Sequence, residues 1–540
     1  MRTLTTLAAI GGVMLLAGCA KNAAIQYQSL VHAYDTAGNG AYYDAQTEPT
    51  TQTGERVKAD RSQWEAARQK LAAQKEAWTR ALGSHGPSAS RFYAPDAGTM
   101  AEYAALAEDR DAAEDLLAAG ASRDDVTALA VLWNPDIRAA REKMRSKLEQ
   151  YSQVAYLDDI LLQHNAFAKQ LTTTVGKPRQ KEMMAMEYPF PDGLALKGRI
   201  VTEDVRVAER DVDIATRDVV TAARIAYYDY LFVGEAIRIN GEAEELLNQM
   251  VYVAQAKLRV GIGKYHSVIM GQVELARLGD AILTLEEQRE IVVARLNTLL
   301  DRRADAPLGA PTPVADDDVA AALDDLYLAG AQGAQELQKQ RLMIARMGLM
   351  IEMATRMTYP DSTLGASYFE DRMKLSTGTK PTPPTFQTQR TPNLANAATF
   401  ATGTAYVREA ESRLSAMEEM LAGMTNMTEL AIRKHHFGMD RARRSVALHR
   451  NSLLPQALQA LDAASAAYQT ARVDFVTLLD AERTLLRIQL GEQAALRDHR
   501  THLAELDNAI GSAAPRKPLD LDDLGTTERD EGVDDDGAQE

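Results

Sequence analysis

The sequence has 540 residues, of which 46% are hydrophobic but only 6% aromatic, and its formal net charge is −16. Ala, Leu, Glu, Gln, Arg and Met abound, a composition that favours long helices or coiled coils. The negative charge argues against a nucleic-acid partner, which needs a basic surface. No stretch after Cys19 holds the ~20 apolar residues of a transmembrane helix. If the mature chain crosses a membrane, it must therefore do so as a closed β-barrel.

The first residues predict export from the cytoplasm. Arg2 supplies a positive start, residues 4–16 are mostly apolar but too short to span a bilayer, and small residues precede Cys19. The Leu-Ala-Gly-Cys run resembles the bacterial lipobox, which implies a signal peptide over residues 1–18 and an acylated, palmitate-bearing Cys19. Because Cys19 is the only cysteine, it has no partner for an internal disulfide. Ala20 replaces the Asp that often retains lipoproteins at the inner membrane, so we expect the outer membrane; an ordinary signal peptide is the alternative.

Residues 19–123 form an N-terminal extension to which the sequence assigns no task. The pattern predicts helices over residues 61–82 and 100–118, separated by a Gly- and Pro-containing break at residues 84–96.

Apolar residues recur at coiled-coil spacing from about Asp124 onward, which predicts long supercoiled helices. One helix of about 55 residues, Thr202–Lys257, would be ~80 Å long. The seams are Val205, Ala208, Val212, Ala215, Val219, Ala222 and Ala226; Leu275, Leu278, Ile282, Leu285, Val292, Leu296 and Leu299; and Ala410, Leu414, Met417, Leu421, Met424, Thr428 and Ala431.

An internal repeat organises the chain. Residues 267–272 and 477–482 each follow a turn-like stretch and open a long helix, and a helix that starts at Asn134 corresponds to one that starts near Gln335. We therefore expect a first repeat over residues 124–300, a linker over 301–318 and a second repeat over 319–511. Residues 512–540 are polar and then acidic, which predicts a disordered tail.

Each repeat also contains a non-helical segment at a matching place. Candidate strands are Ile160–Thr174, Glu182–Phe190, Thr363–Lys374 and Asn396–Tyr406, with a Thr-, Pro- and Gln-rich loop over residues 377–392. Strands that span membranes show only weak alternation, so this signal is faint by nature.

Several motifs resemble the TolC-like outer-membrane efflux family. Residues 468–486 look like the family's Y-x-x-G-x-x-x-aromatic-x-x-L-L-D-A-x-R-x-L-L segment, and residues 256–262 look like its counterpart in the first repeat. Further landmarks are Asn134–Arg138, Pro189–Gly193, Ala226–Asp229 and Tyr359–Ala366. The resemblance covers about residues 124–511, and Ala471 departs from it because the family usually has Gly there.

The resemblance implies a mainly α fold in a homotrimer. Long coiled-coil helices would form an α-barrel tunnel, and each chain would give four strands to a shared twelve-stranded β-barrel. Four strands cannot close alone, and an open sheet edge is excluded from lipid. The implied function is a passive exit duct of a tripartite efflux or type I secretion system, with a periplasmic membrane-fusion adaptor and an inner-membrane pump as partners. The cargo stays open between drugs, metals, small molecules and protein.

The resemblance also suggests functional residues. Asp480, with Asp474 as a weaker companion, would form an acidic constriction of the pore; the alternative is a solvated residue paired with Arg483 or Arg487. Val260, Gly261, Ile262, Ala471 and Arg472 would be the tips that dock the adaptor, or they are plain turn residues.

The sequence favours no catalytic site, cofactor or resident metal. It has no phosphate loop, no H-E-x-x-H spacing and no G-x-S-x-G turn. Methionines at 183–186 and 417–439, with His435 and His436, leave metal export open, although most of them have the spacing of helix packing. His499 and His502, at i and i+3, could chelate a metal, although we expect them to be surface residues. Because the strands are polar, a lipid-anchored periplasmic coiled-coil scaffold without an open pore is the second hypothesis.

Overall fold

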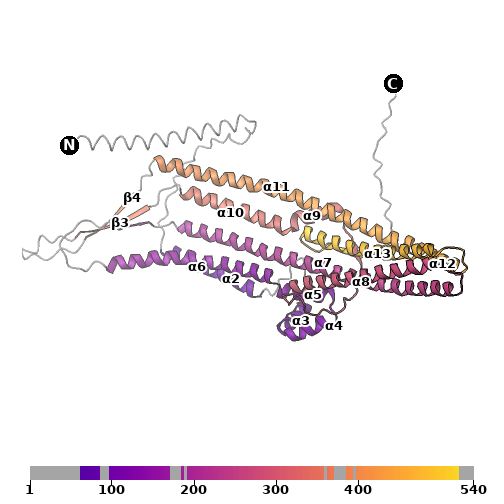
Figure 1. Cartoon of the computed structure of the whole chain (residues 1–540). Coiled ribbons are helices and arrows are strands. Elements are labelled where there is room, and N and C mark those ends of the chain that lie inside the picture. Colours follow the sequence, from indigo (N-terminus) through magenta and orange to yellow (C-terminus); the bar gives the residue numbers. More distant parts are fainter. Residues whose placement is uncertain are drawn as a thin grey trace, which may run out of the picture. The chain divides into compact units, whose positions relative to one another are not determined.

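The computed structural model describes residues 61–84, 97–170, 184–187, 191–357, 362–369, 385–392 and 397–521. Long helices dominate these residues (Figure 1). The predicted signal peptide, the lipidation site Cys19 and the acidic residues after 521 lie outside the described residues. None of the described helices contains an apolar stretch of the length that a bilayer crossing requires.

Two halves repeat one order of elements, as the sequence predicted. The first half contains α5 (Arg123–Trp133), α6 (Pro135–Gln170), β1 (Met184–Glu187), α7 (Pro191–Arg259) and α8 (Tyr265–Leu299). The second contains α9 (Leu323–Gly333), α10 (Gln335–Met357), β3 (Ser362–Phe369), β4 (Thr385–Pro392), α11 (Ala397–Leu448), the π-helical turn η4 (His449–Leu453), α12 (Leu454–Gln469) and α13 (Phe475–Ile510). In each half a short helix therefore leads into a long one, β structure follows, and two long helices meet at a turn.

The N-terminal extension folds onto the first half. It contains α2 (Arg61–Ser84), α3 (Ala97–Glu108) and α4 (Arg110–Ala119). The helix predicted over residues 100–118 is divided because the Asp109 side chain accepts from the Ala112 amide and starts a new helix. Leu71 of α2 is 6% exposed and packs against α6 and α7. It fills the space beside Gly198, where a Cβ would come within 2.4 Å of its methyl group.

The 69-residue helix α7 is the centre of the packing, since it contacts α6, α8, α10 and α13. At 1.5 Å per residue it is roughly 100 Å long. Its seam residues Val205, Ala208, Val219 and Ala226 are buried, as the coiled-coil spacing predicted. The buried Tyr227 donates its hydroxyl to the carbonyl oxygens of Ala121 and Thr312, so α7 also holds the linker between the halves.

The packing face of α11 changes partner part-way along the helix. The predicted seam from Ala410 to Thr428 is half-buried, and Gln340 of α10 donates to the Met417 carbonyl at 2.9 Å. From Ile432 onward the buried positions instead join a core with α9 and α13. Gly330 permits α9 and α11 to approach closely, because a Cβ at this position would lie 2.4 Å from the Ile432 side chain.

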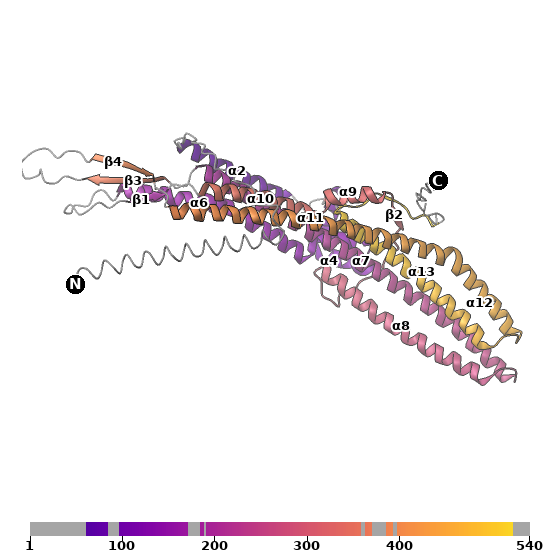
Figure 2. The same ribbon diagram turned by 90° about the horizontal axis from the view of Figure 1, so that it is seen from above.

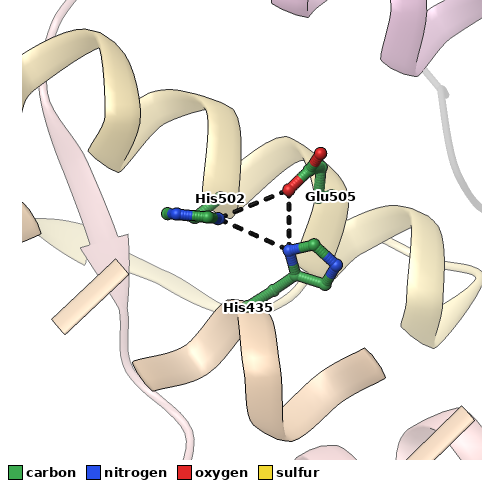
Figure 3. Close-up of side chains that lie close together, drawn as sticks. All are labelled: His435, His502 and Glu505. Atoms are coloured by element: carbon green, nitrogen blue, oxygen red, sulfur yellow. Dashed lines mark hydrogen bonds and ion pairs between the residues drawn. The ribbon is translucent and has the colours of Figure 1, made fainter. Parts of the chain in front are cut away.

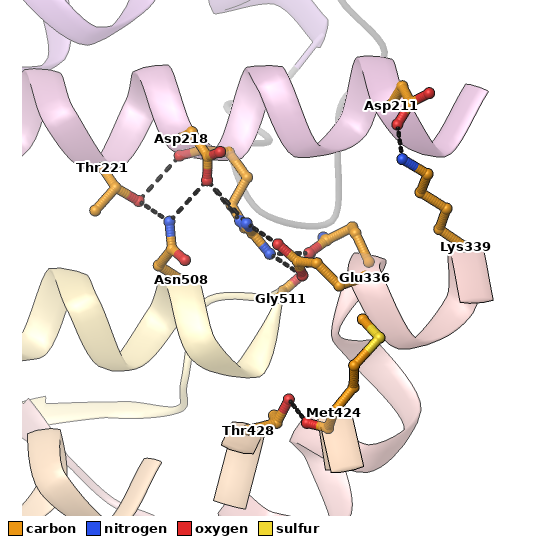
Figure 4. Close-up of polar contacts among 11 residues, drawn as sticks. Asp211, Asp218, Thr221, Glu336, Lys339, Met424, Thr428, Asn508 and Gly511 are labelled. Atoms are coloured by element: carbon orange, nitrogen blue, oxygen red, sulfur yellow. Dashed lines mark hydrogen bonds and ion pairs between the residues drawn. The ribbon is translucent and has the colours of Figure 1, made fainter. Parts of the chain in front are cut away.

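Polar contacts join α7, α10 and α13 near the start of the second half, where Asp218, Glu336 and Asn508 lie close together (Figure 4). Arg217 of α7 is 4% exposed and donates to the Glu336 carboxylate at 2.6 Å and to the Gln335 side chain at 3.1 Å. Gln335 donates in turn to the Gly511 carbonyl at 2.7 Å. In the first half Asn134 makes the equivalent bond to the Leu299 carbonyl at 3.1 Å. The duplication therefore extends to the polar contacts that close each half.

Three described strands form an antiparallel sheet in the order β1-β3-β4, with Gly365 opposite Ala185 and Gln389. The strands predicted at Glu182–Phe190 and Thr363–Lys374 are confirmed over Met184–Glu187 and Thr363–Phe369, and their other residues lie outside the described part of the chain. The strand predicted at Ile160–Thr174 is wrong over Ile160–Gln170, because α6 continues through these residues without a Gly or Pro to end it. The strand predicted at Asn396–Tyr406 is also wrong: α11 begins at Ala397, and the strand β4 lies in the segment expected to be a loop.

The tail predicted to be disordered from residue 512 is wrong over its first residues. β5 (Arg516–Pro518) pairs antiparallel with β2 (Asp317–Val319), at the end of the predicted linker. Arg516 forms an ion pair with Asp507, which is fully buried. The residues that follow α13 are thereby paired with the segment that precedes α9.

Candidate functional site at the helical tips

Two turns with the same hydrogen-bond pattern join the long helices. In the first, the amides of Gly261 and Ile262 donate to the carbonyls of Leu258 and Lys257, both at 3.0 Å. In the second, the amides of Ala471 and Arg472 donate to the carbonyls of Tyr468 and Ala467, at 3.0 and 2.8 Å. This is the arrangement in which a residue in the left-handed region ends a helix and satisfies its last carbonyls. The residues predicted as tips therefore lie in turns.

The turns differ in the residue that takes the left-handed conformation. Gly261 has φ 80° and Ala471 has φ 59°. A residue with a Cβ is disfavoured there by about 1–2 kcal/mol. The left-handed backbone at Ala471 therefore explains why glycine is favoured at this position, where the sequence departs from the motif.

Direct contacts join the two tips, which lie side by side in Figure 2. Lys264 and Asp474 occupy the residues just before α8 and α13 and form an ion pair at 2.8 Å across 210 residues of sequence. The Lys257 ammonium lies 4.2 Å from the centroid of the Tyr468 ring. Phe475 fills the space beside Gly271, where a Cβ would come within 3.2 Å of its ring. The tips of the two halves thus form one surface.

This surface exposes large apolar side chains. Val260 is 70% exposed, Ile262 69% and Tyr265 68%. Large apolar side chains exposed close together in one turn are a candidate interaction surface. The sequence identified Val260 and Ile262 but missed Tyr265 and Lys264, which the 210-residue offset between the repeats would have placed beside the second tip.

The two predicted acidic residues of the constriction both have cationic partners within the chain. Asp480 is 64% exposed and lies 3.4 Å from Arg483, whereas Asp474 pairs with Lys264. Arg483 also donates to Glu274 of α8 at 3.0 Å, and these hydrogen bonds lower the pKa of the Glu274 carboxyl despite its partial burial. The pair with Arg483 that was considered for Asp480 is therefore present.

Glu482 is an acidic residue that the sequence did not single out. It is 2% exposed on the buried face of α13, and its Oε1 has no hydrogen-bond partner among the described residues. Burial, reinforced by the charge of Glu274, raises the pKa of the Glu482 carboxyl to about 7.

The methionines and histidines considered as metal ligands lie in several places, although His435 and His502 come together, with their Nδ1 atoms 3.4 Å apart. Met417 and Met424 line the half-buried seam of α11, whereas Met184 lies in β1. The expectation that His499 lies at the surface is wrong: its side chain is fully buried, 3.6 Å from Asp318. His502 is partly buried and faces α11.

The described chain is similar to solved outer-membrane proteins. It aligns with VceC of Vibrio cholerae at a TM-score of 0.55 and 14% identity, over 72% of this chain and 96% of that one. For the MtrE outer-membrane channel of Neisseria gonorrhoeae the TM-score is 0.56 at 13% identity, over 73% and 89% of the chains. For the Campylobacter jejuni channel CmeC it is 0.54 at 11% identity, over 73% and 86%.

The chain has the TolC-like fold. The resemblance found in the sequence motifs is thereby confirmed for the architecture: long paired helices in two repeats, with β structure between them. No protein-family model matches the sequence, and no curated protein shows significant similarity to it. Identities of 11–14% to the solved structures agree with this, since packing periodicity survives changes that erase sequence similarity.

Proposed function

We propose that this protein is the outer-membrane exit duct of a tripartite efflux or type I secretion system. The observation that carries the proposal is the match of the two-repeat helical architecture to outer-membrane channels over most of their length. In this proposal the protein moves cargo passively, and an inner-membrane pump supplies the energy. Cys19 carries lipid that anchors the chain to the outer membrane.

A stripe of exposed apolar residues on α11 supports assembly into a homotrimer. Met420, Met427, Leu430 and Phe437 are 58%, 66%, 59% and 51% exposed. The first pair and the second pair are each separated by seven residues, which is the spacing of a coiled-coil seam. Fully burying such a side chain contributes about 1.5–3 kcal/mol, so the exposed parts would contribute about 1–2 kcal/mol each against a neighbouring subunit.

The edges of the sheet support the same assembly. Among the described strands, β1 and β4 are the outer ones and each has one unpaired edge. In the proposed trimer each subunit gives four strands to one twelve-stranded barrel, and three of the four are β1, β3 and β4. Closure would remove every free edge.

The tips are the proposed docking surface for a periplasmic adaptor. Val260 and Ile262 supply apolar contact area, Gly261 and Ala471 fix the turns, and Arg472 adds a positive charge. We expect Arg472→Glu to weaken crosslinking of the cognate adaptor to the tips in native membranes, because it reverses a charge in the interface. Unchanged crosslinking in that variant would contradict the assignment.

The proposed constriction is a ring of three Asp480 carboxylates near the tips, with Asp474 alongside. Three like charges on one axis attract cations and repel one another. The bond from Arg483 to Glu274 on α8 also holds the helices of the two tips together.

Single-channel conductance in planar bilayers tests this function. The purified protein should form cation-selective pores, and Asp480→Ala should raise their conductance. Asp462→Ala is the matched control, since Asp462 is an exposed carboxylate on α12, away from the tip. Absence of pores would contradict the duct and favour a lipid-anchored scaffold, whereas pores of unchanged conductance would contradict only the constriction.

A further inference from the structure

Three side chains from two helices converge on one point (Figure 3). His435 comes from α11, and His502 and Glu505 come from α13 one helical turn apart. The Nδ1 atoms of the two histidines are 3.4 Å apart. Oε2 of Glu505 lies 2.7 Å from Nδ1 of His435 and 3.3 Å from Nδ1 of His502.

These separations are close to those of ligands around one tetrahedral ion. Zinc binds imidazole nitrogen at about 2.0–2.1 Å and carboxylate oxygen at about 2.0–2.2 Å, so two ligands at the tetrahedral angle are about 3.3–3.5 Å apart. Two of the three observed distances have this value. The third distance, from Glu505 Oε2 to His435 Nδ1, must increase by roughly 0.6 Å, which a small rotation of the Glu505 side chain allows.

The donor chemistry fits the same ion. Two imidazoles and one carboxylate are ligands that zinc accepts, and they leave a fourth position for water. Metal binding requires a neutral imidazole.

The surrounding structure holds the groups in place. The ring of His502 lies directly over Gly438 of α11, where a Cβ would come within 2.7 Å of its carbon and nitrogen atoms. Ile432, Met439 and Leu503 pack the two helices together on either side of the cluster. The ligands therefore project from packed helices, which fix a metal site better than loops do.

We propose that His435, His502 and Glu505 form a zinc site that clasps α11 to α13. The site lies where α11 changes its packing partner from α10 to α9 and α13, so a bound ion would fix that crossing. The inference does not depend on the duct function, because it concerns contacts within one chain.

The test is a Zn²⁺ titration of the full-length, detergent-solubilised protein, stripped with a chelator and carrying no histidine tag. A competing chromophoric chelator reports affinity and stoichiometry. We expect one tightly bound Zn²⁺ per chain, bound at least 10-fold more weakly in Glu505→Gln and in His502→Ala. His266→Ala is the matched control, since His266 is an exposed histidine at the start of α8, and it should bind like the wild type.

Two further measurements distinguish loss of the metal site from misfolding of the variants. Gly438→Ala keeps all three ligands but displaces the His502 ring, so it should weaken binding about 10-fold, as loss of a supporting contact does. In the wild type, Zn²⁺ should slow hydrogen exchange in α11 and α13 around the cluster. Absence of stoichiometric binding, binding that survives the ligand substitutions, or exchange that Zn²⁺ leaves unchanged would overturn the proposal.

Discussion

Replacement of Glu482 by glutamine should stabilise the protein at neutral and alkaline pH. In the folded chain the pKa of this carboxyl is about 7, because burial and then the charge of Glu274 disfavour its ionised form. In the unfolded chain the pKa lies near 4.5. Between these two values the folded state holds a proton that the unfolded state has released.

The sign and the size of the effect follow from this difference. Because the folded state binds more protons, the free energy of unfolding falls as the pH rises from 4.5 to 7 and is then constant. Each unit of pKa difference corresponds to about 1.4 kcal/mol, so the full loss is about 3 kcal/mol per chain. Glutamine cannot ionise, so Glu482→Gln should match the wild type at pH 4 and exceed it by about 3 kcal/mol at pH 8.

Thermal denaturation followed by circular dichroism at pH 4, 6 and 8 measures the difference between variant and wild type. Titrating groups that do not interact with Glu482 contribute equally to both proteins and cancel. Glu492→Gln is the contrasting control, because Glu492 is buried to a similar extent but pairs with Arg450 at 2.7 Å, and its loss should lower stability at pH 8. A Glu482→Gln variant that is less stable than the wild type at pH 8, or a difference independent of pH, would refute the reasoning.

Three other pairs of substitutions test the packing and the assembly. Gly511→Ala should lower the free energy of unfolding by about 2–4 kcal/mol, because the backbone has a positive φ and the new Cβ would lie only 2.4 Å from the Gly333 oxygen. Gly261→Ala should lower it by only about 1 kcal/mol, because the space around Gly261 is free. Thermal denaturation measures both differences. Glu336→Gln should destabilise the protein by about 1–2 kcal/mol, more than Arg217→Met, since it leaves the buried Arg217 with one of its two carboxylate partners, Asp218. The opposite order would contradict this account of the ion pair. Met427→Glu should shift the assembly toward monomers in native mass spectra while Met427→Leu should not; equal trimer content would show that the α11 stripe is not an interface.

The sequence predicted the helical part of the fold because that part depends on local periodicity. The seven-residue spacing marked the buried seam of α7, and a turn motif repeated at an offset of 210 residues located both tips. The same offset relates Lys264 to Asp474, so this ion pair was also within reach of the sequence. The start of α11 at Ala397 was missed because Asn396–Tyr406 was assigned to a strand.

The strands and the buried polar groups were harder for a physical reason. β4 consists largely of Thr, Gln and Arg, a composition without the apolar alternation that distinguishes a strand from a loop. The burial of His499 depends on Asp318, and the position of His435 depends on Glu505, each from a distant part of the chain. Such contacts arise only when segments distant in the sequence pack together, so no local pattern encodes them.

Native mass spectrometry of the full-length protein extracted in mild detergent, with negative-stain imaging of the same sample, tests the central claim most directly. The account predicts a mass near that of three chains and a tube with three-fold symmetry. A monomeric mass, or particles that are not closed around an axis, would contradict the proposed duct.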